Sequence, residues 1–385
     1  MRPLRVAMIG QRGVPATFGG VERHVEEVGA RLAERGHEVT VYSRSNYVEE
    51  QRSTYRGMRV RTLSTIGTKH LDAIVHSGLS TVDAMRTGVD IVHYHAIGPG
   101  FPSFLPRTIS RAKVVQTVHG RDAERSKWSP AARTILRTGE WLSARIPDAT
   151  IVVSRDLARH YAARFGRATT YIPNGVDEPE RRPPSEITER FGLRGGDYVL
   201  FVGRMVPEKE PDLLVRAFRD LPGDLRLVLA GGSSYTSEYV RGLESLARAD
   251  PRVLMPGYVY GSLLDELYTN AAAFVLPSSL EGLPLTLLEA CAYGTGVVVS
   301  DIPPNLEVVG GDGPGHRVFH AGDRSGLTHA LGRAIDDAVV DRTAPTDLQR
   351  HVLSAYRWDV AVDATEAVYA SVLRRASRRG SGSLV

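Results

Sequence analysis

The chain has 385 residues, of which 42% are hydrophobic and 24% are charged, as is typical of a globular protein with two or three domains. A single cysteine excludes an intramolecular disulfide framework, and no apolar run approaches the roughly 18–20 residues of a membrane span. Residues 1–177 carry 26 basic and 16 acidic residues, a net charge of +10, whereas residues 178–385 carry 22 and 28, a net charge of −6. Opposite signs predict two domains, the first facing an anionic partner.

The first half alternates short β-branched runs with amphipathic stretches, a pattern typical of parallel sheets covered by helices. Its opening run, residues 4–10, ends at a glycine and leads into a patterned domain. We therefore interpret it as a strand rather than a signal peptide. A helix is predicted from about Val21 to Glu34, because Gly19 and Gly20 precede it and Gly36 stops it. Further strands are predicted over residues 37–43, 90–95, 113–119 and 149–154.

A proline-rich polar segment, residues 174–192, interrupts this pattern and predicts an interdomain linker followed by a short helix. The second half then restarts with strands predicted over residues 198–203, 225–232, 252–259, 272–277 and 296–301. The predicted fold class is therefore α/β, with two Rossmann-like doubly wound domains facing a cleft. The expected domains are residues 1–177 and 178–362, followed by a C-terminal helix and basic tail over 363–385. Ligands of such sheets bind in the loops that follow the strands.

The first such loop covers residues 10–24, between a strand and its helix. Glycines let the backbone approach a ligand, and the helix N-terminus after Gly20 favours an anion. The loop does not match the dinucleotide fingerprint, because two residues separate Gly10 from Gly13. A simple flexible turn remains the alternative.

The second loop covers residues 201–214 and presents Arg204 and Lys209 ahead of Pro211, the expected first residue of a helix. A guanidinium fork and an ammonium point charge at this position suit a diphosphate. The alternative is a solvated loop in which these cations pair with Glu208 and Glu210.

The third loop and helix, residues 277–301, place Glu281 and Glu289 with seven residues between them. We expect a helix from Pro284 to Gly294 that is apolar all round and therefore buried, with Cys291 as core filler. A carboxylate inside such a helix must accept hydrogen bonds, which vicinal hydroxyls supply, while helix-terminal amides suit phosphate oxygens. The pattern favours a nucleotide sugar as ligand. An ion pair between Glu289 and an arginine is the alternative.

These residues together resemble the family-4 retaining glycosyltransferases of GT-B fold. The resemblance covers nearly the whole chain and rests on the two glutamates within 281–301, the loop 202–218 and "IPNGVD" at 172–177. The start, "GQRGVPATFGGVERHVEE" at 10–27, is further similar to that of bacterial capsule and cell-wall rhamnosyltransferases, which use dTDP-L-rhamnose.

The resemblance implies a role for each matching residue of the second half. Arg204 and Lys209 would neutralise the donor diphosphate and assist its departure, Glu281 would bind hydroxyls of the transferred sugar, and Glu289 would bind the ribose. The remaining donor-binding positions are Gly282, Leu283, Pro284 and Leu285, of which Leu283 and Leu285 would offer backbone amides.

In the first half, the resemblance implies that Gly19 and Gly20 approach the diphosphate and that His119 lies near the transferred sugar. A structural histidine at a strand end is the alternative for His119. The candidate catalytic residues are thus His119, Arg204, Lys209 and Glu281. Residues 356–373 resemble the segment that crosses back onto the first domain, with Trp358, Val362 and Tyr369 as packing residues.

Two positions depart from the family pattern. Glu210 follows Lys209 where the family commonly has glycine, and Pro303-Pro304-Asn305 stands where a glycine-containing turn is usual. Both departures lie beside the predicted donor pocket.

The implied reaction moves a sugar from a dTDP-, UDP- or GDP-sugar to a sugar or lipid-linked hydroxyl, with retention at the anomeric carbon. No cofactor and no metal are expected, because cations and helix amides can stabilise the leaving diphosphate, and no Asp-x-Asp or His/Cys cluster of metal-ligand spacing is visible; "HYH" at 93–95 is interpreted as strand plus loop. A nucleotide-sugar epimerase and a non-catalytic sugar-nucleotide-binding module are the competing functions.

The acceptor side is predicted from residues 121–145, where basic residues surround Trp128 and Trp141. This mixture suits an anionic membrane surface or a lipid-pyrophosphate acceptor, with an ordinary solvated helix as the alternative. We expect a cytoplasmic protein, or one bound peripherally at the inner face of the membrane. No nucleic-acid partner is expected, because no recognition motif is present.

Overall fold

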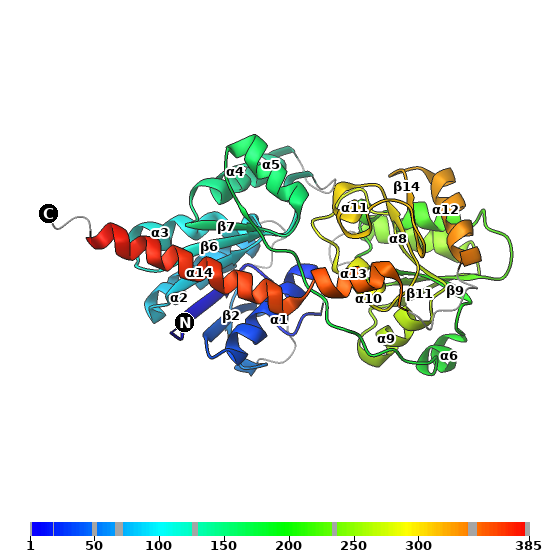
Figure 1. Cartoon of the computed structure of the whole chain (residues 1–385), viewed down its shortest axis with the longest axis horizontal. Helices are drawn as coiled ribbons and strands as arrows, with labels where there is room; N and C mark the ends of the chain where they lie inside the picture. The colour runs from blue at the N-terminus through cyan, green and yellow to red at the C-terminus, as the bar shows by residue number, and fades with distance from the viewer. Residues whose placement is uncertain are drawn as a thin grey trace. The chain divides into compact units, whose positions relative to one another are not determined.

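The structure, a computed structural model, describes residues 2–17, 19–47, 52–65, 72–124, 130–232, 237–337 and 345–381. The chain divides into two compact units, of which residues 1–174 and 358–385 form the first and residues 175–357 the second. Each unit is a largely parallel sheet with helices packed on it (Figure 1). The predicted α/β class with two doubly wound sheets is confirmed.

The sheet of the first unit has the strand order β3-β4-β2-β1-β5-β6-β7-β8 and is parallel except for the β3–β4 hairpin. Strands β2, β4 and β3 extend the sheet on one side of β1, and strands β6, β7 and β8 extend it on the other side of β5. Because β1 and β5 are paired neighbours, the strand order reverses between them, which is where ligands bind in such sheets. The strands are β1 (Arg5–Ile9), β2 (Glu38–Arg44), β3 (Thr54–Tyr55), β4 (Met58–Leu63), β5 (Ile91–His95), β6 (Lys113–Val118), β7 (Ala149–Val152) and β8 (Thr170–Tyr171).

The first unit's central strands are buried on both faces, which explains their near-continuous apolar runs. In β1, Val6, Ala7, Met8 and Ile9 are fully buried. The helices are α1 (Gly20–Glu34), α2 (Asp72–Thr87), α3 (Phe104–Ile109), α4 (Pro130–Arg145), α5 (Arg155–Phe165) and α14 (Trp358–Ser381), with the short 3-10 helices η1 (Gly98–Ser103) and η2 (Asp122–Glu124).

The C-terminal helix α14 belongs to the first unit and contacts α1 (Figure 1, red). Trp358, Val362 and Tyr369 are buried along it, with at most 3% of each exposed, as the packing interpretation predicts. Most of the basic tail predicted at the end of the chain lies outside the described side chains. Among the helices that the structure describes, none has both the length and the hydrophobicity needed to span a membrane.

The sheet of the second unit also reverses its strand order between two neighbouring strands, and its order is β11-β10-β9-β12-β13-β14. Here β9 and β12 are the paired neighbours from which the chain builds outward in opposite directions. The strands are β9 (Tyr198–Val202), β10 (Arg226–Ala230), β11 (Val253–Gly257), β12 (Ala273–Leu276), β13 (Val297–Ser300) and β14 (His316–Phe319). The loops after β9 and β12 therefore flank the second unit's switch point.

Helices pack on this sheet around an apolar core that includes Phe201, Phe218 and Leu229. They are α6 (Glu186–Phe191), α7 (Pro211–Phe218), α8 (Ser237–Arg248), α9 (Gly261–Asn270), α10 (Leu285–Ala292), α11 (Pro303–Val309), α12 (Arg324–Asp337) and α13 (Asp347–Ala355), with the 3-10 turn η3 (Pro207–Lys209). The short helix predicted after the linker is α6.

Every strand predicted from the sequence is present, and so is the helix that begins at the Gly19-Gly20 pair. The sequence interpretation missed β3, β4, β8 and β14. Of these, β3, β8 and β14 lie at sheet edges and β3 and β8 have only two residues each, whereas β4 is an interior six-residue strand whose apolar alternation went unrecognised. One boundary is wrong: Pro284 has an extended backbone (φ −76°, ψ 113°) and precedes α10 as its N-cap, so the first helical residue is Leu285.

Candidate active site

The loop after β9 presents Arg204 and Lys209 at the second unit's switch point. It continues through η3 and ends at Glu210, whose left-handed backbone (φ 49°, ψ 41°) turns the chain into α7 at Pro211. A left-handed conformation is costly for any residue with a Cβ atom and cheap for glycine. Glu210 therefore adopts the backbone that the family's usual glycine would provide, and this first departure from the pattern leaves the loop's path as a glycine would set it.

The loop after β12, residues 277–284, is tied to the Lys209 loop through the backbone. The Ser279 amide donates to the carbonyl of Glu208 at 3.0 Å. Its other side is held by Ser300, whose hydroxyl donates to the carbonyl of Ser278 at 2.5 Å. Asn305 in turn donates to the Ser300 carbonyl and hydroxyl. The second departure, Pro303-Pro304-Asn305, thus starts α11 with two prolines and supplies an amide that braces the loop.

These ties bring Lys209 and Glu281 into a short ion pair, with Nζ to Oε1 at 2.5 Å. The two side chains are 13% and 9% exposed, so the pair is shielded from water although it lies in loops. The solvated-loop alternative placed the partners of Lys209 at Glu208 and Glu210, whereas the structure gives it Glu281, which lies 72 residues further along the chain. Shielding of this kind strengthens the interaction of both groups with a charged ligand.

Glu289 lies on the second turn of α10, as the sequence predicts. The helix is buried through Leu285, Leu287, Leu288 and its alanines, and Glu289 itself is half-buried. The hydroxyl of Tyr268 donates to Glu289 Oε2 at 3.0 Å. Burial and the neighbouring Glu289 carboxylate raise the pKa of Tyr268 well above its usual value, so Tyr268 stays a hydrogen-bond donor at neutral pH.

Tyr268 is held by a second tyrosine. Its ring stacks on Tyr293 with centroids 5.2 Å apart and ring planes 10° from parallel, and Tyr293 donates to Asp265 Oδ1 at 2.6 Å. The Glu289 carboxylate is therefore oriented by a rigid aromatic pair. Sequence reasoning found Glu289 but missed this support, because the three partners lie on α9 and at the end of α10.

The segment Gly282–Leu283–Pro284–Leu285 connects the two glutamates and is buried throughout. It leads into the N-terminus of α10, where the first amides have no acceptor within the helix and the helix dipole is positive. The Lys209–Glu281 pair, the Glu289 carboxylate and the N-terminus of α10 thus lie in the segments that follow β9 and β12, and Arg204 lies on the first of these loops. The arrangement can hold a ligand with hydroxyl groups on both sides of an anionic centre.

In the first unit, the loop after β1 approaches β5 closely. Gly10 has a φ of +124°, and a Cβ atom there would lie 2.2 Å from the carbonyl oxygen of His95, so only glycine fits. The loop's amides at Arg12 and Ala16 donate to the carboxylates of Glu22 and Glu26 on α1. These two donors are thus engaged by side chains of α1.

The Gly19-Gly20 pair begins α1 and is exposed. Gly19 has a φ of +96° and is the N-cap of the helix. Its approach to a diphosphate remains a prediction, as do the roles assigned to the residues of the second unit.

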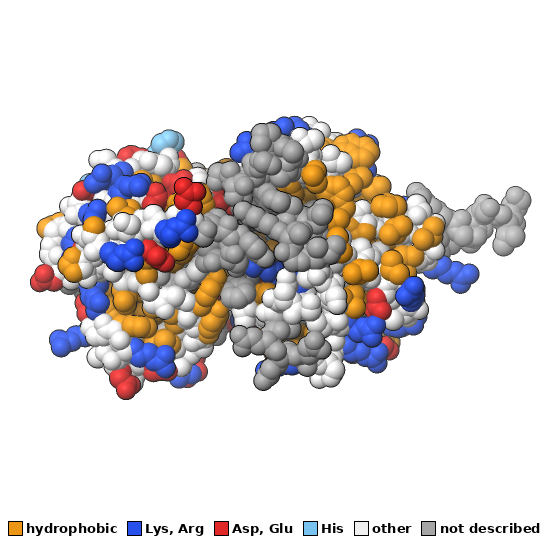
Figure 2. Space-filling model, turned by 180° about the vertical axis from the view of Figure 1, so that it is seen from behind, with side chains coloured by type: hydrophobic (Ala, Val, Ile, Leu, Met, Phe, Trp, Pro, Cys, Tyr) orange, Lys and Arg blue, Asp and Glu red, His pale blue; other side chains and the backbone are white. Residues whose placement is uncertain are grey.

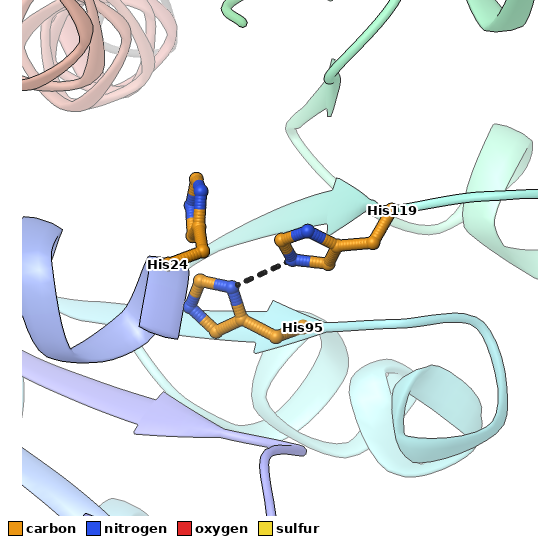
Figure 3. A group of neighbouring side chains, drawn as sticks. All are labelled: His24, His95 and His119. Carbon is orange, nitrogen blue, oxygen red and sulfur yellow. Dashed lines mark hydrogen bonds between the residues drawn. The ribbon is translucent and has the colours of Figure 1, made fainter. Parts of the chain in front are cut away.

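His119 lies beyond β6 and contacts two other histidines of the first unit, His95 at the end of β5 and His24 on α1 (Figure 3). His95 Nδ1 and His119 Nε2 are 3.3 Å apart, and His24 Nδ1 is 3.0 Å from Asn174 Oδ1. Burial lowers the pKa of His24 to about 4 and those of His95 and His119 well below their usual value. The three imidazoles are therefore neutral at pH 7.

Sequence reasoning selected only His119 of this group. His24 and His95 were missed because they are 71 residues apart and because "HYH" was interpreted as strand plus loop, whereas all three of its residues lie within β5. The usable signal was position: one histidine follows the Gly-Gly pair by one turn, and the other two end neighbouring strands. Of the acceptor-side residues, Trp141 is 49% exposed on α4, and Trp128 lies outside the described residues.

Comparison with known proteins agrees with this geometry. The model of Glycosyltransferase Family 4 matches residues 18–179, and that of Glycosyl transferases group 1 matches residues 186–349. A D-inositol 3-phosphate glycosyltransferase of Xylanimonas cellulosilytica is 30% identical, over 97% of this chain and 98% of that protein. A GDP-mannose-dependent alpha-(1-6)-phosphatidylinositol monomannoside mannosyltransferase of Mycolicibacterium smegmatis is 28% identical, over 84% and 87%.

Solved structures share the fold at lower identity. A sucrose-phosphate synthase of Thermosynechococcus elongatus superposes with a TM-score of 0.83 at 22% identity, over 97% of this chain and all of the other. HepE of Anabaena, in complex with UDP and glucose, superposes with a TM-score of 0.79 at 18% identity, over 96% of this chain and all of the other. The two doubly wound sheets and their loops are those of the GT-B fold. The chain belongs to glycosyltransferase family 4.

Proposed function

We propose that this glycosyltransferase uses a nucleoside-diphosphate sugar and transfers the sugar to a hydroxyl acceptor with retention at the anomeric carbon. The observation that carries the proposal is the shielded Lys209–Glu281 pair at the β9/β12 switch point, with Glu289 on the adjacent helix. In this assignment Glu289 accepts hydrogen bonds from the ribose and Glu281 from the transferred sugar, while Arg204 and Lys209 contact the diphosphate.

In this proposal the residues act by stabilising negative charge. When the bond between the anomeric carbon and the diphosphate oxygen breaks, its electron pair leaves with the nucleoside diphosphate as negative charge. In this proposal Arg204, Lys209 and the amides at the start of α10 stabilise that charge, and Lys209 is already held by Glu281 before the reaction. The chain itself thus provides the positive charge for this step, and we propose that transfer requires no added metal.

Retention follows, in this proposal, from attack of the acceptor on the same face that the diphosphate leaves. Glu281 is a poor candidate for a covalent nucleophile, because its carboxylate is paired with an ammonium at 2.5 Å. The leaving diphosphate oxygen can instead accept the proton of the acceptor hydroxyl. A glycosyl–Glu281 adduct trapped and identified by mass spectrometry would rule this mechanism out.

The decisive experiment is calorimetric titration with UDP, dTDP, GDP and ADP, followed by transfer and donor-turnover assays with the matching sugars. We expect one nucleotide to bind best and Lys209→Ala to weaken that binding, whereas Arg216→Ala, which removes an exposed cation from α7, should leave it unchanged. Binding without turnover in the presence of diverse acceptors favours the binding-module function, and conversion of the donor sugar without acceptor favours an epimerase.

A dTDP preference would support the narrower proposal of rhamnosyl transfer, which rests on the similarity of residues 10–27. Curated relatives include an inositol-phosphate and a phosphatidylinositol-mannoside glycosyltransferase, so UDP- and GDP-sugars with polyol or lipid-linked acceptors belong in the same screen. The titration separates these donors directly, since the base contacts differ between them.

For the acceptor side, we propose contact with an anionic membrane surface, in agreement with a cytoplasmic enzyme acting at the inner face of the membrane. Phe104 and Ile109 on α3 and Ile135 and Trp141 on α4 are each 49% to 69% exposed, and η1 packs against both helices. Figure 2 shows exposed hydrophobic side chains on this unit. Exposed arginines lie among them, at 107, 111, 137 and 145, and basic residues beside apolar ones favour anionic lipid.

Vesicle flotation tests this contact. We expect the wild-type chain to float with phosphatidylglycerol vesicles and not with phosphatidylcholine vesicles, and a Trp141→Ala, Ile109→Ser variant to lose that difference. Val360→Ser, which removes an equally exposed apolar residue from α14, is the control. Equal recovery of the wild type with both vesicles would refute the membrane proposal.

A further inference from the structure

The histidine group of the first unit has the geometry of a metal site. One ring nitrogen from each of His24, His95 and His119 can be chosen so that all three atoms lie within 4.8 Å of one another. Figure 3 shows the three rings facing a common space from α1, from the end of β5 and from the residue after β6. Because they sit at the β1/β5 switch point, three separate backbone elements fix them.

One edge of this triangle already has the separation that a metal requires. Tetrahedral zinc holds imidazole nitrogens at about 2.0–2.1 Å, which places neighbouring ligand nitrogens roughly 3.3–3.4 Å apart. His95 Nδ1 and His119 Nε2 are 3.3 Å apart. A ring nitrogen of His24 lies within 4.8 Å of the other two ligand atoms, and metal binding would have to draw the three closer together.

The hydrogen bonds of the three histidines leave ring nitrogens that can bind a metal. His24 Nδ1 donates to Asn174 Oδ1, which leaves the Nε2 lone pair free to bind a metal; such a second partner is the usual orienting contact of a metal-bound histidine. The facing nitrogens of His95 and His119 share one proton in the absence of a metal. His95 Nε2 is buried and has no hydrogen-bond partner among the residues that the structure describes.

A fourth histidine shows what a purely structural one looks like here. His93 is also buried on β5 and stacks near His95, but both of its ring nitrogens are engaged, Nδ1 with the hydroxyl of Tyr369 and Nε2 with that of Thr117, each at 2.7 Å. His93 therefore has no lone pair to offer. His24, His95 and His119 differ from His93 because their ring nitrogens lie close to one another and are not all engaged by other protein groups.

We propose that His24, His95 and His119 form a binding site for a divalent transition metal of the zinc class. Three imidazole nitrogens suit zinc, cobalt, nickel or copper, and do not suit magnesium or calcium, which prefer oxygen ligands. His119 is partly exposed, so an ion has a route to the site. Three protein ligands leave a fourth position open to water or another small ligand.

The site goes beyond the proposed transfer reaction, and metal binding does not depend on that proposal.

The test is direct metal binding to the tag-free, full-length chain after removal of metals with EDTA. We expect one zinc ion per chain to be retained through gel filtration and measured by mass spectrometry of the metal. Cobalt added in place of zinc should give the visible absorption of a four-coordinate site with three nitrogen ligands. The donor is absent from this experiment, so its result does not depend on the transferase proposal.

Variants locate the ion. His24→Gln and His95→Gln should each lower zinc affinity by at least about tenfold, and Asn174→Ala by about 10-fold to 100-fold, because orienting partners of metal ligands have effects of that size. His351→Gln, at an exposed position on α13, should have no effect. Failure of the wild-type chain to retain zinc overturns the proposal, whether or not the variants fold. Retention that neither His24→Gln nor His95→Gln reduces, with both folded by circular dichroism, overturns it too.

Discussion

The two switch points of this protein have the same topology, but one presents neutral groups and the other presents charged groups. In the first unit, the loops at β1 and β5 surround imidazoles that burial keeps neutral. In the second unit, the loops at β9 and β12 carry a charged lysine and a charged glutamate in contact. The same α/β frame can thus offer a neutral polar surface or a charged one, and the residues that follow the strands decide which.

The difference is visible in other histidines as well. His76, on α2 of the first unit, is buried and its Nε2 lies 3.1 Å from the Ser43 carbonyl, and burial lowers its pKa to about 4. His320, exposed in the second unit, is bonded to Asp301, and this carboxylate raises its pKa. Burial thus sets the direction of the pKa shift of His76, and pairing with a carboxylate sets that of His320.

The largest expected effect comes from removing the charge of the second unit's site. Lys209→Ala should reduce kcat/KM by about 100-fold to 1000-fold, the range seen when one preorganised group that stabilises a developing anion is lost. Steady-state kinetics with the donor found by titration measure it. Arg216→Ala is the matched control, and a loss of less than about threefold for Lys209→Ala would show that the departing diphosphate does not depend on this ammonium.

The next effect tests the carboxylate supported by the two tyrosines. Glu289→Ala should weaken nucleotide binding by about tenfold to 100-fold, because hydrogen bonds to a charged group contribute about 1.5–3 kcal/mol. Calorimetry with the preferred nucleoside diphosphate measures this loss. Glu189→Ala, an exposed position on α6, is the control, and equal affinities for Glu289→Ala and wild type would remove Glu289 from the ribose site.

The pH dependence of stability tests whether His76 of the first unit is buried in its neutral form. The pKa of His76 is about 4 in the folded chain and about 6.5 in an unfolded one, so between these values the unfolded chain binds the proton more tightly. The stability contributed by neutral His76 is complete above pH 6.5 and is lost as the pH falls toward 4. Wild type should therefore lose more stability between pH 7 and pH 5 than His76→Gln does, by about 1–2 kcal/mol. Urea unfolding at both pH values decides, and parallel losses would contradict the buried-neutral state.

The smallest effect concerns the backbone at Glu210. Glycine and alanine both remove its side chain and differ only in the Cβ atom at a φ of 49°. Glu210→Gly should thus be more stable than Glu210→Ala by about 1 kcal/mol, measured by thermal or urea unfolding. Equal stabilities would mean that the loop leaves the left-handed conformation when the glutamate is gone.

The sequence by itself determined most of the strands, the loops that follow them and most of the candidate residues. Runs such as residues 198–203 and 296–301 have too few polar residues to be anything but buried strands. Glu289 was identifiable because a carboxylate inside an apolar helix needs a partner. These inferences use local pattern and the energy of burial, both of which can be evaluated without knowing what lies across the fold.

Tertiary structure alone decided which of these residues meet. Lys209 pairs with Glu281 because β9 lies beside β12, and His24 meets His95 and His119 because β1, β5 and β6 are consecutive in the sheet. Strand order depends on the packing of the whole chain, and a carboxylate 72 residues away has the same local sequence whether or not a lysine faces it. For the same reason, spacing in the sequence concealed a histidine group that three separate elements assemble.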